Sequence, residues 1–165
     1  MKETLGQLYA KELEMEAPAT RKCIERVPES LYDYKPHEKS MVMRNLVLVT
    51  ADIANWIAHT IKEGDIDFAT YRQVSPKTAA EMTALFDDNL KQALEALNKV
   101  SDEELDKPFN LKNQGQVLMT STKRETIGSS INHLVHHRGQ LTVYIRLCNL
   151  PVPSIYGPSA DEGDF

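Results

Sequence analysis

The sequence predicts an all-α fold, a four-helix bundle formed by a single domain over residues 1–165. Three observations lead to this prediction. Four long segments repeat apolar residues with the 3.6-residue period of an α-helix. No segment shows sustained alternation of apolar and polar residues, and proline or glycine marks the ends of several segments. Four amphipathic helices of this length bury their apolar stripes by packing against one another.

The first predicted helix covers residues 2–27, and Pro28 marks its end. Pro18 interrupts the segment and is expected to kink or split the helix, because proline lacks the N–H that the helical ladder needs. The residues on its apolar face are Leu5, Leu8, Tyr9, Thr20, Cys23 and Val27.

The second predicted helix covers residues 41–63, with Ser40 as its expected N-cap and Gly64 directly after its end. Its apolar stripe is Met43, Leu46, Val47, Ile53, Ala54, Ile57 and Ile61. In the third helix Ser75 is the expected N-cap and Pro76 the first helical residue. Its stripe is Ala79, Met82, Phe86, Leu90, Ala93, Leu97 and Val100.

The fourth predicted helix begins at Thr122, which forms a capping box with Glu125, and ends near Asn149, two residues before Pro151. Its stripe is Ile127, Ile131, Leu134, Leu141 and Ile145. Residues 28–40 and 65–75 are expected to be connections. Residues 101–121 are expected to cross the bundle, with one helical turn at residues 102–105.

The composition excludes several classes of protein. Hydrophobic residues at 41% and charged residues at 26% are typical of a globular domain. A net charge of -5 without a Lys/Arg run argues against a nucleic-acid partner. No apolar run approaches the roughly 20 residues that span a bilayer, and the N-terminal residues do not resemble a signal peptide. We therefore expect a cytoplasmic protein without a membrane partner, with Cys23 and Cys148 as reduced thiols.

His133 and His137 form the most chemically suggestive pair in the sequence. At about 100° per residue they lie one turn apart on the shoulder of the buried stripe, together with Ser130, Gln140 and Tyr144. Two imidazoles in this relation are able to chelate one divalent metal. The alternative is a pair of half-buried histidines that hydrogen-bond to their neighbours.

Arg138 falls on the apolar stripe itself, where an unpaired guanidinium would cost several kcal/mol. It needs a carboxylate, an edge position or a ligand. On the first helix Glu12 and Glu16 fall within the inward stripe, so one is expected to pair with Arg138 and the other to serve as a metal ligand or a base. The alternative is that the helix kink and bundle twist move both to the rim.

Two residues of the second helix share the corresponding shoulder. Asp52 is a candidate metal ligand or a hydrogen-bond partner for an imidazole, and the alternative is a carboxylate that faces solvent. Trp56 is expected to form a core or pocket wall, with stacking on a substrate as the alternative.

Several motifs together resemble the DinB-like superfamily of DNA-damage-inducible helical-bundle proteins. The run from Ile131 to Leu141, which contains His-His-Arg-Gly-Gln, resembles the last-helix signature of the family, and residues 153–162 resemble the tail that follows it. Residues 20–29 and 34–40 resemble the first half of one branch. The resemblance covers most of the chain and implies a DinB-like four-helix bundle.

The resemblance also implies a divalent metal, nickel or zinc, held by three histidines, of which His133 and His137 match two. The third belongs to the second helix, at the position that Val49 occupies here. Three outcomes remain open, because valine cannot bind a metal and three protein ligands are the usual minimum for a catalytic site. The metal is lost, or a substitute such as Asp52, Glu12 or Glu16 completes the site, or waters complete a weak site.

Characterised relatives are similar to metal-dependent transferases of low-molecular-weight thiols such as bacillithiol or mycothiol. In such an enzyme a metal lowers the pKa of the bound thiol. Arg138 or Tyr144 would bind or orient the thiol, with Trp56 in the pocket wall and a small electrophile as second substrate. One alternative is a non-catalytic small-molecule-binding or stress-response bundle that has lost the metal. Another is a structural homodimer, and the resemblance makes a homodimer plausible in each case.

Overall fold

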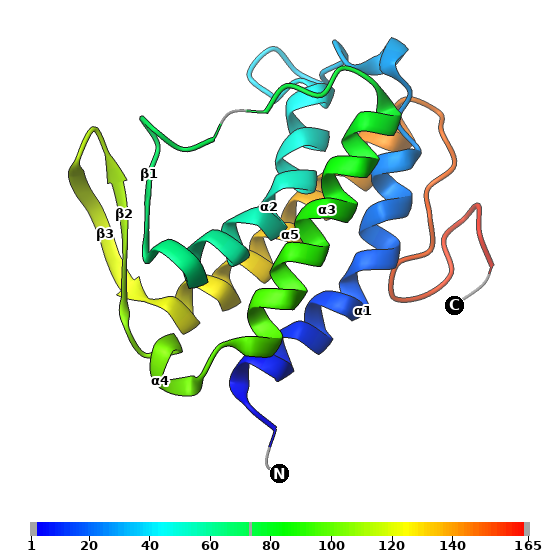
Figure 1. The fold of residues 1–165 in the computed structure, drawn as a ribbon. Helices are drawn as coiled ribbons and strands as arrows, with labels where there is room; N and C mark the ends of the chain where they lie inside the picture. The colour runs from blue at the N-terminus through cyan, green and yellow to red at the C-terminus, as the bar shows by residue number, and fades with distance from the viewer. Residues whose placement is uncertain (1–2, 73, 164–165) are drawn as a thin grey trace.

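The computed structural model describes residues 3–72 and 74–163 (Figure 1). Four long helices form its main body, as the sequence predicts, and their apolar stripes pack on one another. These helices are α1 (Leu5–Glu25), α2 (Met43–Glu63), α3 (Ala79–Lys99) and α5 (Lys123–Leu147). A 3-10 turn, η1 (Glu29–Leu31), follows α1, and the short helix α4 (Asp102–Leu105) confirms the helical turn expected there.

The apolar side chains pack in two clusters along the bundle. One cluster includes Cys23, Leu46, Phe86 and Leu141, and the other includes Leu13, Ile57, Leu97 and Ile131. The predicted stripes of α2, α3 and α5 are buried or half-buried throughout. An exception occurs on α1, where Leu8 is 49% exposed. Both cysteines have free thiols.

The helix ends agree with the sequence in some places and not in others. Thr122 and Glu125 form the predicted capping box. The predicted start of α3 is wrong, because the side chain of Thr78 caps that helix, while Ser75 and Pro76 accept hydrogen bonds from the guanidinium of Arg44.

Ser40 does not cap α2, which begins after Val42. The first N–H groups of this helix, those of Met43 and Arg44, donate instead to the carbonyl oxygens of Tyr34 and Tyr32, at 2.7 and 3.0 Å. Backbone carbonyl groups of the preceding loop therefore accept the hydrogen bonds that a capping side chain would otherwise accept. Gly64 ends the helix in the left-handed conformation, with φ 76°, as the sequence predicts.

Pro18 does not split α1, which continues through it from Leu5 to Glu25. Pro18 and Glu14 are both exposed, so the break in the hydrogen-bond ladder falls on the side of the helix that faces water.

A three-stranded sheet stands beside the helices, so the prediction of an all-α fold is wrong for this part of the chain (Figure 1). β1 (Asp65–Asp67) pairs in parallel with β2 (Pro108–Asn113), and β2 pairs antiparallel with β3 (Gln116–Thr122). The strands do not show the alternation of apolar and polar residues that would predict them, for two reasons. A register shift between Leu111 and Lys112 breaks the alternation, and Val117, Leu118 and Met119 are all exposed in succession.

The turn between β2 and β3 is held by a carboxylate from another part of the sheet. Gln114 and Gly115 both have positive φ, 50° and 78°, as in a tight two-residue hairpin turn. The N–H groups of Gln114 and Gly115 donate to Asp67 at 3.0 and 2.7 Å, and the N–H of Ala69 donates to the same carboxylate at 2.9 Å. These bonds, that of Ala69 first, lower the pKa of Asp67. Asp67 thus fixes the end of the hairpin to the end of β1.

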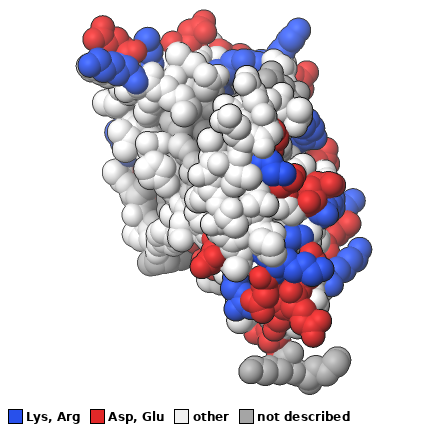
Figure 2. All heavy atoms as spheres, turned by 90° about the vertical axis from the view of Figure 1, so that its left-hand side faces the viewer, with Lys and Arg blue, Asp and Glu red and all other residues white. Residues whose placement is uncertain are grey.

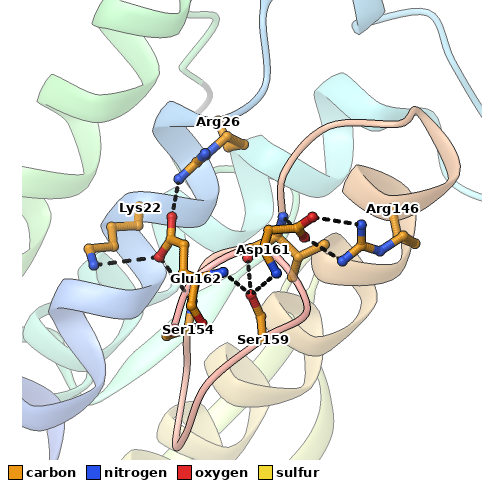
Figure 3. A network of polar contacts seen from close by, with 8 residues as sticks. Lys22, Arg26, Arg146, Ser154, Ser159, Asp161 and Glu162 are labelled. Carbon is orange, nitrogen blue, oxygen red and sulfur yellow. Dashed lines mark hydrogen bonds and ion pairs between the residues drawn. The ribbon is translucent and has the colours of Figure 1, made fainter. Parts of the chain in front are cut away.

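The C-terminal tail returns along α1, on the opposite side of the helices from the sheet (Figure 1). Two adjacent carboxylates fasten it (Figure 3). Asp161 pairs with Arg146 and accepts the N–H of Val152 at 2.8 Å. Glu162 accepts from Arg26 at 2.6 Å and from the N–H of Ser154 at 3.1 Å. The tail therefore links the ends of α1 and α5.

None of the helices in residues 3–72 and 74–163 has both the length and the apolar character needed to cross a membrane.

Candidate functional site

His133 and His137 meet on the half-buried side of α5. Their Nε2 atoms are 2.7 Å apart and their ring centroids 4.5 Å apart, so both imidazoles point toward one place. His136 is exposed, as predicted, and its ring stands at 66° to that of His137. The i, i+4 spacing thus produces the side-by-side arrangement that the sequence predicts.

Gln140, one turn further along α5, fixes the proton on His137. Its Oε1 lies 2.8 Å from Nδ1 of His137. In the tautomer that matches a Gln140 oxygen at Nδ1 of His137, Nε2 of His137 accepts from Nε2–H of His133. Burial first, and then the charges of His137 and His136, lower the pKa of His133. His133 is therefore a neutral imidazole near pH 7.

The described residues contain no group of three or more His, Cys, Asp and Glu side chains placed to hold a metal ion. Val49 is half-buried and packs against both apolar clusters. The three expected substitute ligands do not complete the histidine pair. Glu12 is exposed rather than inward, Glu16 pairs with Arg138, and Asp52 has its own polar partners on α3 and on the connection between α2 and α3. The residues present therefore do not match the three-ligand metal site that the resemblance implies.

Arg138 is almost completely buried, at 2% exposure, and it contacts α1 and the C-terminal tail. Nη1 lies 2.5 Å from a carboxylate oxygen of Glu16 and 3.1 Å from the carbonyl oxygen of the same residue, which confirms the predicted pairing with one glutamate of α1. Nη1 also donates to Thr20, and Nη2 donates to the hydroxyl of Tyr156 at 2.7 Å. The guanidinium that the sequence suggests for substrate binding thus joins α1, α5 and the C-terminal tail.

Tyr144 and Trp56, the other two candidate substrate-binding residues, have different surroundings. The hydroxyl of Tyr144 donates to the carbonyl oxygen of Met41 at 2.9 Å, and its ring packs edge-on against Tyr34 in the core. Trp56 lies near the histidine pair, with 6.3 Å between its ring centroid and that of His133. Trp56 forms a pocket wall, as the sequence predicts.

A hollow of about 380 Å³, which we call the hairpin hollow, lies between the β2–β3 hairpin, the first half of α5 and Trp56. On the hairpin, two directly opposed pairs line it, Phe109 with Ser121 and Leu111 with Met119. Such alternate residues on paired strands share one face of a sheet. The residues of α5 that line the hollow are Glu125, Thr126, Ser129, Ser130 and His133.

The spacing of these α5 residues explains why the hollow reaches the histidines. Glu125, Ser129 and His133 follow one another at four-residue intervals, so they lie along one line of the helix. The carboxylate of Glu125 is held by the N–H of Thr122 at 2.9 Å, which is the main cause of its lowered pKa. The side of the molecule that Figure 2 presents has few charged side chains in its central part.

Sequence reasoning did not find the hairpin side of this hollow. Phe109 is almost fully buried and Leu111 half-buried, although both lie in a segment expected to be a connection. The sequence does contain a short pattern typical of a strand and a turn: Phe109 and Leu111 alternate with polar residues, and Gly115 follows them at the turn.

Comparison with known proteins agrees with this architecture. The protein YjoA of Bacillus subtilis (strain 168), described as uncharacterized, is 26% identical over 127 residues, which are 77% of this chain and 80% of YjoA. YrdA of the same organism, also described as uncharacterized, is 56% identical over 32 residues, 19% of each chain.

Solved structures described as DinB-like have the same fold. The crystal structure of YjoA superposes with a TM-score of 0.71 at 20% identity, over 96% of this chain and 99% of that one. A DinB-like protein from Bacillus cereus gives a TM-score of 0.67 at 19% identity, over 90% of this chain and 95% of that one. The model of the DinB family matches residues 1–164, and the resemblance seen in the last helix is thereby confirmed: this chain is a member of the DinB family.

Proposed function

We propose that this protein binds a small, largely apolar molecule in the hairpin hollow, and that His133 recognises a polar group of that molecule. The observation that carries the proposal is the hollow itself, about 380 Å³ in volume, with His133 in its wall. Concave, mainly apolar sites with a few polar groups are where proteins usually bind small molecules.

The walls suit a ligand with an apolar body. Trp56, Phe109, Leu111 and Met119 supply aromatic and aliphatic surface on one side. On the α5 side, the hydroxyl of Thr126 donates to the carbonyl oxygen of Thr122, and that of Ser130 donates to the carbonyl oxygen of Thr126. Because both hydroxyl protons are already used within the helix, these side chains do not require a charged ligand.

The polar part of the ligand meets a neutral imidazole. In the tautomer in which Nε2–H of His133 donates to His137, Nδ1 of His133 is an acceptor. A hydroxyl, thiol or amide N–H on the ligand would satisfy that acceptor. In this function His133 orients the ligand and needs no metal.

The experiment fills the hollow without disturbing the core. Ser129 lines the hollow but is exposed, so Ser129→Phe is expected to place a ring in the hollow while the protein stays folded. Asn132→Phe is the matched control, because Asn132 is exposed on the same helix and does not line the hollow. With 1-naphthol as probe, saturation-transfer NMR should show binding to the wild type and to Asn132→Phe, and loss of binding in Ser129→Phe. Equal binding by all three proteins would contradict the proposal.

A second candidate is the metal-dependent thiol transfer that the family resemblance implies. The observation in its favour is the convergence of the two Nε2 atoms, together with Gln140, which holds the other nitrogen of His137 as outer partners of metal-binding histidines commonly do. This function requires that atoms from outside the protein complete the ligand set, because Val49 supplies none. Elemental analysis of protein purified without chelators, beside His137→Ala, separates the two functions. Close to one metal ion per chain in the wild type and none in the variant would favour the second.

A further inference from the structure

A second hollow, of about 330 Å³, shares Trp56 with the hairpin hollow but otherwise has different walls. It is formed by α2 and by the connection from β1 to α3. The residues that line it are Asn45, Leu48, Val49, Asp52, Trp56, Tyr71, Arg72 and Val74.

Asp52 places a negative charge in the wall of the second hollow. Its side chain is only 13% exposed. Two neutral groups donate to it, the hydroxyl of Tyr71 at 3.3 Å and the amide of Asn89 at 3.2 Å. Burial raises the pKa of Asp52, against the opposing effect of Arg72. The carboxylate is thus hydrogen-bonded, but its charge is only weakly compensated.

The cation nearest to Asp52 is Arg72, whose Nη2 makes two long contacts, 3.5 Å to Asp52 and 3.3 Å to the side-chain oxygen of Asn89. Nη2 of Arg72 lies 3.5 Å from the carboxylate of Asp52, whereas Nη1 of Arg138 lies 2.5 Å from Glu16, a carboxylate of similar exposure. The Arg72 side chain is 48% exposed, so it reaches Asp52 from the solvent side. A long pair of this kind stabilises little, and a competing cation would displace it readily.

Aromatic rings adjoin the carboxylate. Trp56 and Tyr71 both line the second hollow, with ring centroids 5.6 Å apart and planes at 67°. Phe68 extends the group, 5.9 Å from Trp56. Rings at an angle to one another beside an anion are the surroundings in which proteins hold ammonium groups, because the faces of the rings attract positive charge.

We propose that the second hollow is a binding site for an organic ammonium ion, with Asp52 as its counter-ion and Trp56 and Tyr71 around its alkyl groups. An anionic ligand fits this hollow less well, because its charge would face Asp52, which lies deeper than Arg72. The proposal does not depend on the hairpin hollow, since the two share a single residue.

The test uses choline as probe and 3,3-dimethylbutan-1-ol as its uncharged analogue of the same shape. Trp56 is the single tryptophan of the chain and lines both hollows, so its emission reports binding in either, and Ser129→Phe, which fills the hairpin hollow, assigns the signal to the second hollow. Choline should change Trp56 emission saturably in the wild type, and the uncharged alcohol should bind at least about tenfold more weakly.

Three variants make the test specific. Asp52→Asn keeps the shape and removes the charge, so choline binding should weaken roughly tenfold or more. Asp88→Asn, an exposed position on α3, is the control with the same change in net charge and should bind like the wild type. Arg72→Gln removes the internal competitor and should bind choline severalfold more tightly, a result that a purely structural role of Arg72 would not give.

The outcomes decide the question. Equal binding of choline and its uncharged analogue, or tighter binding of the anion 3,3-dimethylbutanoate, would overturn the proposal. If Asp52→Asn does not fold, Arg72→Gln still decides it, since unchanged or weaker choline binding there contradicts the competition. Ser129→Phe should leave choline binding intact, which separates this site from the proposed function of the hairpin hollow.

Discussion

The guanidinium of Arg138 lies among apolar side chains and holds three parts of the chain together. Its partners come from α1 and from the C-terminal tail, through Glu16, Thr20 and Tyr156. A buried charge of this kind is tolerated because both members of the pair are hydrogen-bonded, not because the pair adds much stability.

Removal of Arg138 alone is therefore expected to be costly. Arg138→Met leaves the carboxylate of Glu16, which is 14% exposed, without its cation, and should lower the free energy of unfolding by about 3–5 kcal/mol. Urea denaturation of the variant beside Arg146→Met, whose side chain is 48% exposed, provides the measurement and its control. A loss below about 1 kcal/mol in Arg138→Met would show that the pair is not needed.

The position of Val49 offers a direct test of metal binding by the histidine pair. The family resemblance assigns the third ligand to this position, so Val49→His should raise nickel affinity by roughly a hundredfold or more, because it restores a three-histidine set. Isothermal titration with nickel measures the gain, and Val49→Ala is the control for lost packing. A gain that persists after His133→Ala in the same variant would mean that the added histidine binds metal elsewhere.

The turn of the β2–β3 hairpin is held by the carboxylate of Asp67, which lies on β1. Asp67→Ala removes the acceptor of the N–H groups of Gln114 and Gly115, so amide hydrogen exchange in the turn should accelerate while the helices remain protected. Asp65→Ala is the comparison, because it removes the partner of Lys112 on β2 but no acceptor of the N–H groups in the turn. Unchanged exchange at Gly115 in Asp67→Ala would contradict this role.

The tail should loosen in acid. Asp161 has a pKa below its ordinary value of 3.8, chiefly because of Arg146, so the folded state binds a proton at Asp161 more weakly than the unfolded state does. Its stabilisation is therefore complete above pH 3.8 and is lost as the pH falls through the lower folded pKa. Glu162 acts in the same direction, through the N–H of Ser154 and then Arg26.

Hydrogen exchange of residues 152–162 as a function of pH measures this effect. Asp161→Asn should show the acid-like, faster exchange of the tail already at pH 7, while α3 remains unaffected. Tail exchange in the wild type that is independent of pH, once corrected for the intrinsic rate, would show that the carboxylates do not fasten it.

In the molecule as a whole, the four long helices were predictable from the sequence, whereas the hairpin hollow was predictable only on its α5 side. The stripes of α2, α3 and α5 follow from a 3.6-residue period that packing reinforces, and the pairing of Arg138 with a glutamate of α1 follows from the cost of a buried charge. The hairpin was not predictable in the same way, because a register shift and an exposed strand remove the two-residue period.

The same distinction applies to the candidate site. His133 and His137 are neighbours along one helix, so local geometry fixes their approach. The wall opposite them depends on which connection folds back, and no local pattern in residues 101–121 specifies that Phe109 and Leu111 face α5. The exposure of Glu12 likewise follows from the rotation of α1 in the bundle, which a helical wheel alone does not give.

Amide chemical-shift mapping with 1-naphthol in the presence of a chelator tests whether the hairpin hollow binds a small molecule without a metal. We expect saturable shifts that are confined to β2, β3, the first half of α5 and the surroundings of Trp56, and that the chelator leaves unchanged. Shifts that require added metal, or that spread without saturation over α1 and the tail, would contradict it.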